Sequence, residues 1–292
     1  MENTQTNSPS EILEGNIKTE VKRVNMPIFK LVLLGILAGM FIAGGAAASN
    51  VAMHNISNVG LARLVAGVIF PVGLMMIVLV GGELFTGDCL LILGIMDKKY
   101  NVLQAIKVLV IVFITNLLGS VIIAFIVYES GQFNYTDGLL GAFTIKVALS
   151  KTGLSFTNAF CSGILCNIFV CLAVLMAASS KQVSGKILGI FFPIMAFVVS
   201  GYEHCVANMY YIPAGIIAKM NDSYVAKAKD AYNFTDAKLD GLNIKTFFVD
   251  NLIPVTLGNI VGGMLFVGVI LYLVNHNLGT CFQNYYLLKH SN

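Results

Sequence analysis

The sequence predicts an all-α membrane protein, and three observations carry this prediction. Hydrophobic residues make up 57% of the 292 residues and charged residues only 11%, whereas soluble domains usually carry about 25% charged residues. The mean hydropathy is +0.81. Apolar runs long enough to cross about 30 Å of hydrocarbon recur along the chain. The formal net charge is +3, and no stretch concentrates Lys and Arg densely enough to follow phosphates, so the composition argues against a nucleic-acid partner.

Residues 1–27 precede the first apolar run and predict a short cytoplasmic amphipathic helix. Ser8-Pro9-Ser10-Glu11 reads as a capping box with proline at the first helical position. Apolar residues follow at helical spacing, and basic residues gather towards the end of the segment. Two interpretations remain open for this helix: it rests on the membrane surface, or it forms a movable plug below a pore.

Residues 28–276 form the predicted channel-like membrane domain, with six spans. The candidate spans are 30–50, 62–96, 102–128, 156–180, 186–219 and 248–275. An even number of crossings places both ends on one side, and residues 277–292 are predicted to be a C-terminal tail. The connections 97–101 and 181–186 each carry two lysines next to a span, which favours cytoplasmic termini and the cytoplasmic (inner) membrane.

The second and fifth spans are too long for a straight upright crossing. Residues 62–96 would form a helix about 50 Å long. Each run contains glycine followed by polar residues, at Gly81 to Asp88 in one and at Ser200 to Asn208 in the other. The pattern therefore predicts that both helices are interrupted in their interiors.

The two interruptions occupy the same place in two successive three-helix units. A three-helix unit that is repeated once must be inverted the second time, because an odd number of crossings ends on the opposite face. Irregular backbone at bilayer depth is tolerated where it lines a cavity or is buried in protein. Since a charged residue there costs roughly 2.5 to 3.5 kcal/mol, Glu203, His204 and Asn208 are predicted to face a path through the protein. The alternative, a histidine in an interhelical hydrogen bond beside closely packed glycines, would explain one unusual segment but not two.

Bulky apolar side chains on the interrupted helices predict a narrow route. Phe70 and Leu74 are one helical turn apart, Phe85 lies inside the first interruption, and Phe197 precedes His204 by about two turns. Each of them alone is also compatible with ordinary core packing. The cysteines form no CxxC pair, and the sequence predicts neither a metal site nor a cofactor.

The strings "GGELFTGD", "SGYEHCVANMYYIPAGI" and, at residues 251–263, "NLIPVTLGNIVGG" resemble signatures of the formate/nitrite transporter family. The resemblance covers residues 28–276 and keeps its order and spacing through all six spans. It implies an aquaporin-like fold, a homopentamer with a separate path in each protomer, and transport of formate, nitrite or hydrosulfide, with no enzymatic activity.

The resemblance also implies roles for individual residues. Thr86 and His204 would form a central polar pair, and Lys151 would be the basic residue near the outer mouth. The two apolar constrictions would be formed by Phe70, Leu74, Phe85 and Phe197. We hypothesise that Lys151 attracts the anion and that His204 supplies positive charge or a proton, with Glu203 and Asn208 as supporting polar residues.

One residue departs from the family pattern, and two other classes of function remain to be weighed. Asp88 stands where Asn or Ser is expected, and a carboxylate there would repel anions unless it is neutral, paired or turned away. An aquaporin-like pore for small neutral solutes is the main alternative, although the chain lacks paired Asn-Pro-Ala boxes. An intramembrane enzyme that uses His204 with a cysteine or a glutamate is disfavoured, because Cys205 adjoins His204 and adjacent side chains diverge on a helix.

Overall fold

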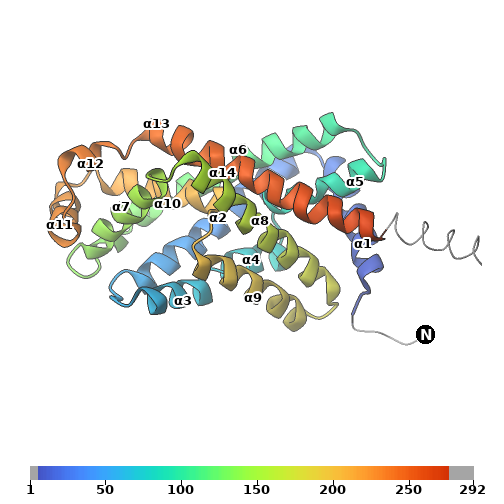
Figure 1. Ribbon diagram of the computed structural model, residues 1–292, viewed down its shortest axis with the longest axis horizontal. Coiled ribbons are helices and arrows are strands. Elements are labelled where there is room, and N and C mark those ends of the chain that lie inside the picture. The colour runs from blue at the N-terminus through green and yellow to red at the C-terminus, as the bar shows by residue number, and fades with distance from the viewer. Residues whose placement is uncertain (1–5, 276–292) are drawn as a thin grey trace, which may run out of the picture.

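The computed structural model describes residues 6–275, and this part of the chain is helical (Figure 1). Within it, six apolar segments are long enough to span a membrane. They are Ile28–Met53, Val59–Val80, Val102–Glu129, Phe156–Ser179, Val183–Ser200 and Ile244–Asn275. The predicted all-α architecture with six spans is confirmed. The predicted tail, residues 277–292, lies outside the described residues.

Four of these spans begin and end as single helices. They are α2 (Ile28–Met53), α6 (Val102–Glu129), α8 (Phe156–Ser179) and α9 (Val183–Ser200). The second span consists of α3 (Val59–Ile69) and α4 (Val72–Val80), which meet at Phe70 and Pro71. The sixth contains α13 (Ile244–Thr246), α14 (Ile253–Ile260) and two π-helical segments, Phe247–Leu252 and Val261–Val269.

Both predicted interruptions are present. The first polypeptide run leaves α4 at Gly81 and resumes as a 3₁₀ turn (Gly87–Leu91) and α5 (Ile92–Met96). The second leaves α9 at Gly201 and resumes as α10 (Cys205–Ala218). Gly81 has φ of 115° and Gly201 has φ of 72°, and side chains with a Cβ rarely adopt such angles. Glycine therefore allows the chain to leave each helix at low cost.

Two buried asparagines fix the interruptions in the same way in both halves. Asn116 of α6 accepts a hydrogen bond from the amide of Phe85 at 3.0 Å and donates to the carbonyls of Gly35 and Glu83. Asn259 of α14 makes the matching set in the second half. It accepts from the amide of Cys205 at 2.9 Å and donates to the carbonyls of Gly163 and Glu203. These matched contacts fit the two inverted three-helix repeats, and they satisfy backbone groups that no helix pairs at the interruption.

The N-terminal helix α1 (Pro9–Val24) begins with the predicted capping box, in which Ser8 and Glu11 bond each other's backbone amides. Its buried Leu13 and Ile17 pack in a cluster with Leu90 of the 3₁₀ turn and Leu93 of α5, which follow the first interruption. The apolar face of α1 is therefore covered by protein. The helix lies at one end of the molecule, opposite α7 and α11 (Figure 1), and we call the two ends the α1 face and the α7 face.

The α7 face contains helices that the sequence pattern did not predict. They are α7 (Leu139–Thr152), α11 (Asp222–Tyr232) and α12 (Asp236–Asp240). Figure 1 shows α7 beside α10, and Gly215 of α10 explains the close approach, because a Cβ there would stand 2.3 Å from the Cβ of Ala148. This packing brings the last turn of α7, which carries Lys151, next to the second interruption.

Candidate functional site

His204 is the N-cap residue of α10, and its imidazole ring joins the two interruptions. Nδ1 accepts a hydrogen bond from the amide of Ala207 at 3.0 Å. Nε2 lies 2.9 Å from Oγ1 of Thr86, which belongs to the first interruption. His204 is 3% exposed and Thr86 is fully buried. The predicted central pair is thus in contact at the place where the two halves meet.

The cap determines which ring nitrogen carries hydrogen. Because Nδ1 accepts from a backbone amide, the neutral ring must carry its hydrogen on Nε2. Nε2 then donates to Thr86 Oγ1, and the threonine hydroxyl keeps its own hydrogen for another acceptor. Protonating Nδ1 would break the cap at the positive end of the helix. The resting arrangement is therefore a neutral imidazole in a fixed orientation.

Two cavities approach this pair from opposite faces. The cavity on the α7 side has a volume of about 140 Å³, and its lining includes Phe70, Phe197, Lys151 and His204. The cavity on the α1 side has a volume of about 320 Å³, and its lining includes Leu74. Phe70 and Leu74 are one turn apart, so the barrier between the cavities is about one helical turn thick at this point.

The side chains at this barrier are apolar and tightly packed. Phe70 and Phe197 form an edge-to-face pair with ring centroids 5.6 Å apart, and Phe197 stacks on the imidazole of His204 at 5.9 Å. Phe70, Leu74 and Phe197 are each no more than 3% exposed. Phe85 has a different position: its ring packs against Phe113 of α6 at 5.0 Å, and it lines neither cavity.

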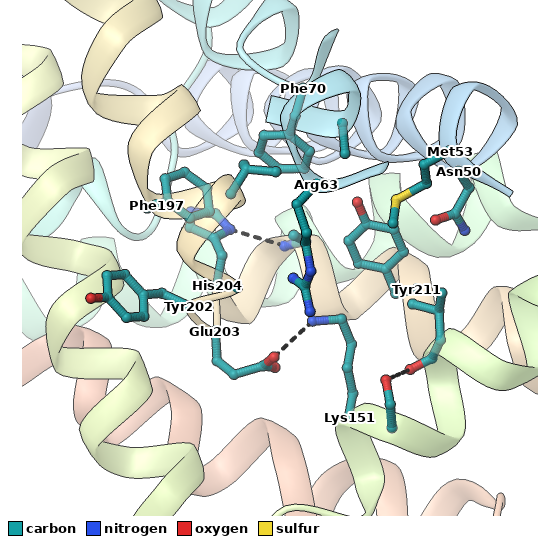
Figure 2. A pocket seen from close by; sticks show the side chains of 16 residues that line it. Asn50, Met53, Arg63, Phe70, Lys151, Phe197, Tyr202, Glu203, His204 and Tyr211 are labelled. Carbon is teal, nitrogen blue, oxygen red and sulfur yellow. Dashed lines mark hydrogen bonds and ion pairs between the residues drawn. The ribbon is translucent and has the colours of Figure 1, made fainter. Parts of the chain in front are cut away.

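Glu203 pairs with Lys151 instead of His204. The Lys151 ammonium donates to one carboxylate oxygen of Glu203 at 2.9 Å (Figure 2). The other oxygen accepts from Asn208 at 2.6 Å and from Asn251 at 3.4 Å. Asn251 also donates to the backbone carbonyl of Lys151. This network holds the lysine at the rim of the α7-side cavity, and Asn251 is a member that the sequence pattern did not reveal.

A second ionic cluster lies on the α1 face around Arg23. Its guanidinium contacts Glu83 through Nε, bonds Glu20 at 2.5 and 2.6 Å, and lies 3.3 Å from Asp88. Asp88 is therefore paired, which answers the question raised by its departure from the family pattern. The sequence pattern did not single out Arg23, because two of its acidic partners, Glu83 and Asp88, stand about sixty residues further along the chain.

Asn116 and Asn259 are further site-forming residues that the sequence interpretation missed. A usable signal was present: each is an asparagine inside an apolar run, three residues before a glycine, in "TNLLGS" and "GNIVGG". Polar side chains at bilayer depth need a partner. A search for the same polar residue in the third span of each half would have found both.

Comparison with known proteins agrees with this geometry. Residues 10–273 match the Formate/nitrite transporter family. The chain is 39% identical to a probable formate transporter of Methanothermobacter thermautotrophicus, with 82% of this chain and 87% of that protein covered. It is also 39% identical to the formate channel FocA of Haemophilus influenzae, over 72% of this chain and 73% of FocA.

Solved structures show the same fold. A pentameric formate channel with formate bound superposes with a TM-score of 0.75 at 35% identity, covering 85% of this chain and 97% of that one. A second structure, an ion channel of the same family, has a TM-score of 0.75 at 27% identity, covering 90% of this chain and 98% of that one. These relatives are transporters and channels, not enzymes. The chain belongs to the formate/nitrite transporter family of membrane proteins.

Proposed function

We propose that this chain forms a channel for small monovalent anions of weak acids, namely formate, nitrite or hydrosulfide. The observation that carries the proposal is the Thr86–His204 pair, buried where two cavities from opposite faces come within one turn of each other. Family membership and the formate named in relatives support the substrate class. In this proposal Phe70, Leu74 and Phe197 line the apolar constrictions, and Phe85 contributes to them from its position against Phe113.

The mechanism follows from the cost of moving an ion through a dry constriction. Burying an isolated ion in a low-dielectric medium costs tens of kcal/mol by Born estimates, so a bare anion is blocked there. A weak acid avoids this cost when it accepts a proton or a strong hydrogen bond. Lys151 draws the anion into the α7-side cavity. His204 supplies positive charge or a proton after its ring takes up a proton from water at Nδ1, which displaces the Ala207 amide from that nitrogen. Loss of one proton to the guest then returns the ring to the neutral state. The Thr86 hydroxyl, which accepts from Nε2 of His204, is free to donate its own hydrogen to the guest.

Glu203 and Asn208 act as supporting polar residues in this proposal. Their bonds hold the Lys151 ammonium in place without consuming the imidazole. We further propose a homopentamer, as in the pentameric formate channel, in the cytoplasmic membrane with both termini in the cytoplasm. The paired lysines beside the spans at the α1 face support that orientation.

An aquaporin-like pore for small neutral solutes is the second candidate. The contacts of the described residues disfavour it, because a half-buried lysine paired with a buried glutamate and a capped histidine at the path have no use in conducting a neutral molecule. Buried charges are costly even when they are paired, and those kept inside membrane proteins mostly mark substrate or ion pathways. Glycerol or urea flux that exceeds formate flux would favour this candidate.

The proposal is tested by transport into proteoliposomes over a pH series. Formate, nitrite and hydrosulfide are offered in parallel to the parent protein, His204→Ala and Thr86→Ala. We expect both variants to lose most of the flux and His204→Ala to lose its pH response. Unchanged flux and pH response in His204→Ala would end the protonation hypothesis.

His204→Asn provides a matched control for structure. Asparagine is also a good N-cap residue, so the start of α10 is retained while the imidazole is removed. We expect His204→Asn to unfold at nearly the parental temperature and still to lose the pH response. If His204→Asn transports like the parent, the histidine serves only as a cap.

A further inference from the structure

A second cation lies beside Lys151, and it comes from the second span. Arg63 of α3 lines the 140 Å³ cavity together with Lys151, and Figure 2 shows its guanidinium directed towards that lysine. Lys151 is bonded to Glu203. Within residues 6–275, the Arg63 guanidinium has neither a hydrogen bond nor an ion pair. Arg63 is exposed on the α7 face, and since Glu203 is engaged by Lys151, Asn208 and Asn251, its guanidinium lines the cavity without a counter-ion.

The backbone of the second interruption determines where this guanidinium lies. A Cβ placed on Gly201 would stand 2.6 Å from Nη1, 3.1 Å from Cζ and 3.2 Å from Nη2 of Arg63. The group therefore lies against the glycine, three residues before His204. Any side chain at position 201 would displace it.

Arg63 also lines a larger cavity of about 520 Å³ on the α7 face. The two cavities share Met53, Arg63, Val147 and Ser150. The larger one is lined by Lys146 and His54 but by no Asp or Glu among the described residues. Lys146 lies over the ring of Tyr232 at 4.5 Å. An anion moving inward would thus meet Lys146 first, then Arg63, and then Lys151.

An unpaired amide in the same cavity independently indicates a ligand. Asn50 of α2 is 4% exposed, and its Nδ2 has no hydrogen-bond partner. It lines the 140 Å³ cavity with Arg63. Buried amide donors are nearly always satisfied. A donor that lacks a partner, in the same cavity as an unpaired guanidinium, is suited to an acceptor that arrives from outside.

We propose that Arg63, assisted by Asn50, is a docking site for planar two-oxygen anions, the class of small carboxylates and nitrite, at the junction of the two cavities. The inference rests on the proposed channel function and adds a specificity determinant to it. A guanidinium presents a rigid fork that bonds two oxygens at once, whereas an ammonium acts as a point charge. Hydrosulfide has one acceptor atom and gains nothing from the fork. Arg63 therefore favours formate and nitrite over hydrosulfide before either reaches His204.

The experiment compares Arg63→Lys with Arg63→Gln in proteoliposomes, with flux through empty liposomes subtracted. Uptake of formate, nitrite and hydrosulfide is measured against concentration at one pH and low ionic strength. Arg63→Lys should raise the half-saturating concentration of formate and nitrite about tenfold, since it keeps the charge and loses the fork, and should leave that of hydrosulfide unchanged. Arg63→Gln should raise all three. Lys245→Gln removes an exposed cation of the same face that lines neither cavity, and it should change none of them.

A binding readout separates this inference from the channel function itself. Formate should raise the thermal unfolding temperature of the parent protein in detergent. The rise should be smaller for Asn50→Ser and absent for Arg63→Gln. Two results would overturn the docking site. One is an equal rise in the half-saturating concentration of all three anions in Arg63→Lys. The other is an equal rise in unfolding temperature on adding formate to the parent and to Arg63→Gln. If the parent conducts none of the anions, the channel proposal fails, and the protection assay alone decides whether the site binds carboxylates.

Discussion

The two interruptions share one scaffold but differ in chemistry. Glu83 and Glu203 occupy equivalent places, as do Phe85 and Cys205, because Asn116 and Asn259 bond these positions in the same way. The backbone amides of the two glutamates also bond to equivalent helices, the first of each half. Glu83 donates to the carbonyl of Leu34 in α2, and Glu203 donates to the hydroxyl of Ser162 in α8. By this register Leu84 stands where the second half has its histidine.

The differences begin at the elements that follow each interruption. The first continues into a 3₁₀ turn and the five-residue helix α5, whereas the second continues into the 14-residue α10. A longer helix presents a stronger N-terminal dipole to its cap. The cation that pairs with each glutamate also differs in origin, with Arg23 coming from α1 and Lys151 from α7. The repeat thus supplies the geometry, and elements outside it supply the charges.

The largest expected effect tests the shared scaffold. Asn116→Leu and Asn259→Leu each leave one amide and two carbonyls without their partner, and an unsatisfied buried group costs about 1 to 3 kcal/mol. Each variant should therefore lose about 3 kcal/mol or more of stability, measured as a fall in the unfolding temperature in detergent. Ser120→Ala, which removes one hydroxyl bond to Gly39 in α2, is the matched mild control. A large fall in unfolding temperature for only one of the two Asn→Leu variants would show that the two asparagines do not contribute equally to stability.

The next effect tests the asymmetry of the ion pairs. Arg23→Met leaves Glu20, Glu83 and Asp88 without their shared cation, and breaking a buried pair in this way costs about 3 kcal/mol or more. Lys151→Met leaves only Glu203, which keeps two amide donors, so its cost should be about 1 kcal/mol. Thermal unfolding of the two variants side by side measures this difference. Equal losses would mean that the amides do not compensate Glu203.

A smaller effect concerns the glycines that open each interruption. Gly81 has φ of 115° and ψ of 138°, a region close to glycine-only, whereas Gly201 has φ of 72° and ψ of 28°, in the left-handed helical region. Gly81→Ala should cost about 2 kcal/mol and Gly201→Ala about 1 kcal/mol from backbone strain. Only Gly201→Ala should also weaken formate uptake, because the new methyl displaces Arg63. Weakened uptake of the same size in Gly81→Ala would contradict this distinction.

Much of this comparison could be predicted from the sequence, and the rest depends on contacts that sequence patterns do not encode. The interruptions could be predicted from the length of each apolar run and from the glycine within it, Gly81 or Gly201. Membrane thickness limits the length of a span, and backbone sterics act within a few residues, so both can be read from a short stretch of sequence. The contact of Thr86 with His204 was expected from the resemblance, although the N-cap role of Nδ1 was not. Arg23 and Arg63 were missed as site residues because each lies beside a distant part of the chain, Arg23 beside Glu83 and Asp88 and Arg63 beside Gly201. The helix α7 was missed for a similar reason. Its sequence has no distinct apolar face, and its position depends on packing against α10.

The smallest effect is a pH dependence that belongs to the first half alone. Glu11 closes the capping box of α1 by accepting from the amide and hydroxyl of Ser8 at 2.7 and 2.8 Å, and these bonds, the backbone one first, hold the pKa of Glu11 below its usual range. Because the folded-state pKa is lowered, the stabilisation is present at neutral pH and is lost as pH falls through that pKa. The first turn of α1 should therefore exchange its amide hydrogens faster at acidic pH, after correction for intrinsic exchange.

Two variants isolate the carboxylate in this prediction. Glu11→Gln keeps a side chain that can close the box but has no titrating group, so the acid-induced loss of protection should disappear. Ser155, the N-cap of α8 at the start of the second half, accepts from Asn158 at 3.2 Å and has an asparagine where the box of α1 has Glu11. The first turn of α8 should accordingly keep its protection over the same pH range. If the first turns of α1 and α8 lose protection together on acidification, the loss comes from the whole domain and not from the cap of α1. Loss of protection in α1 alone would show that the start of this helix, which supplies Arg23 to the first interruption, opens independently of the repeat.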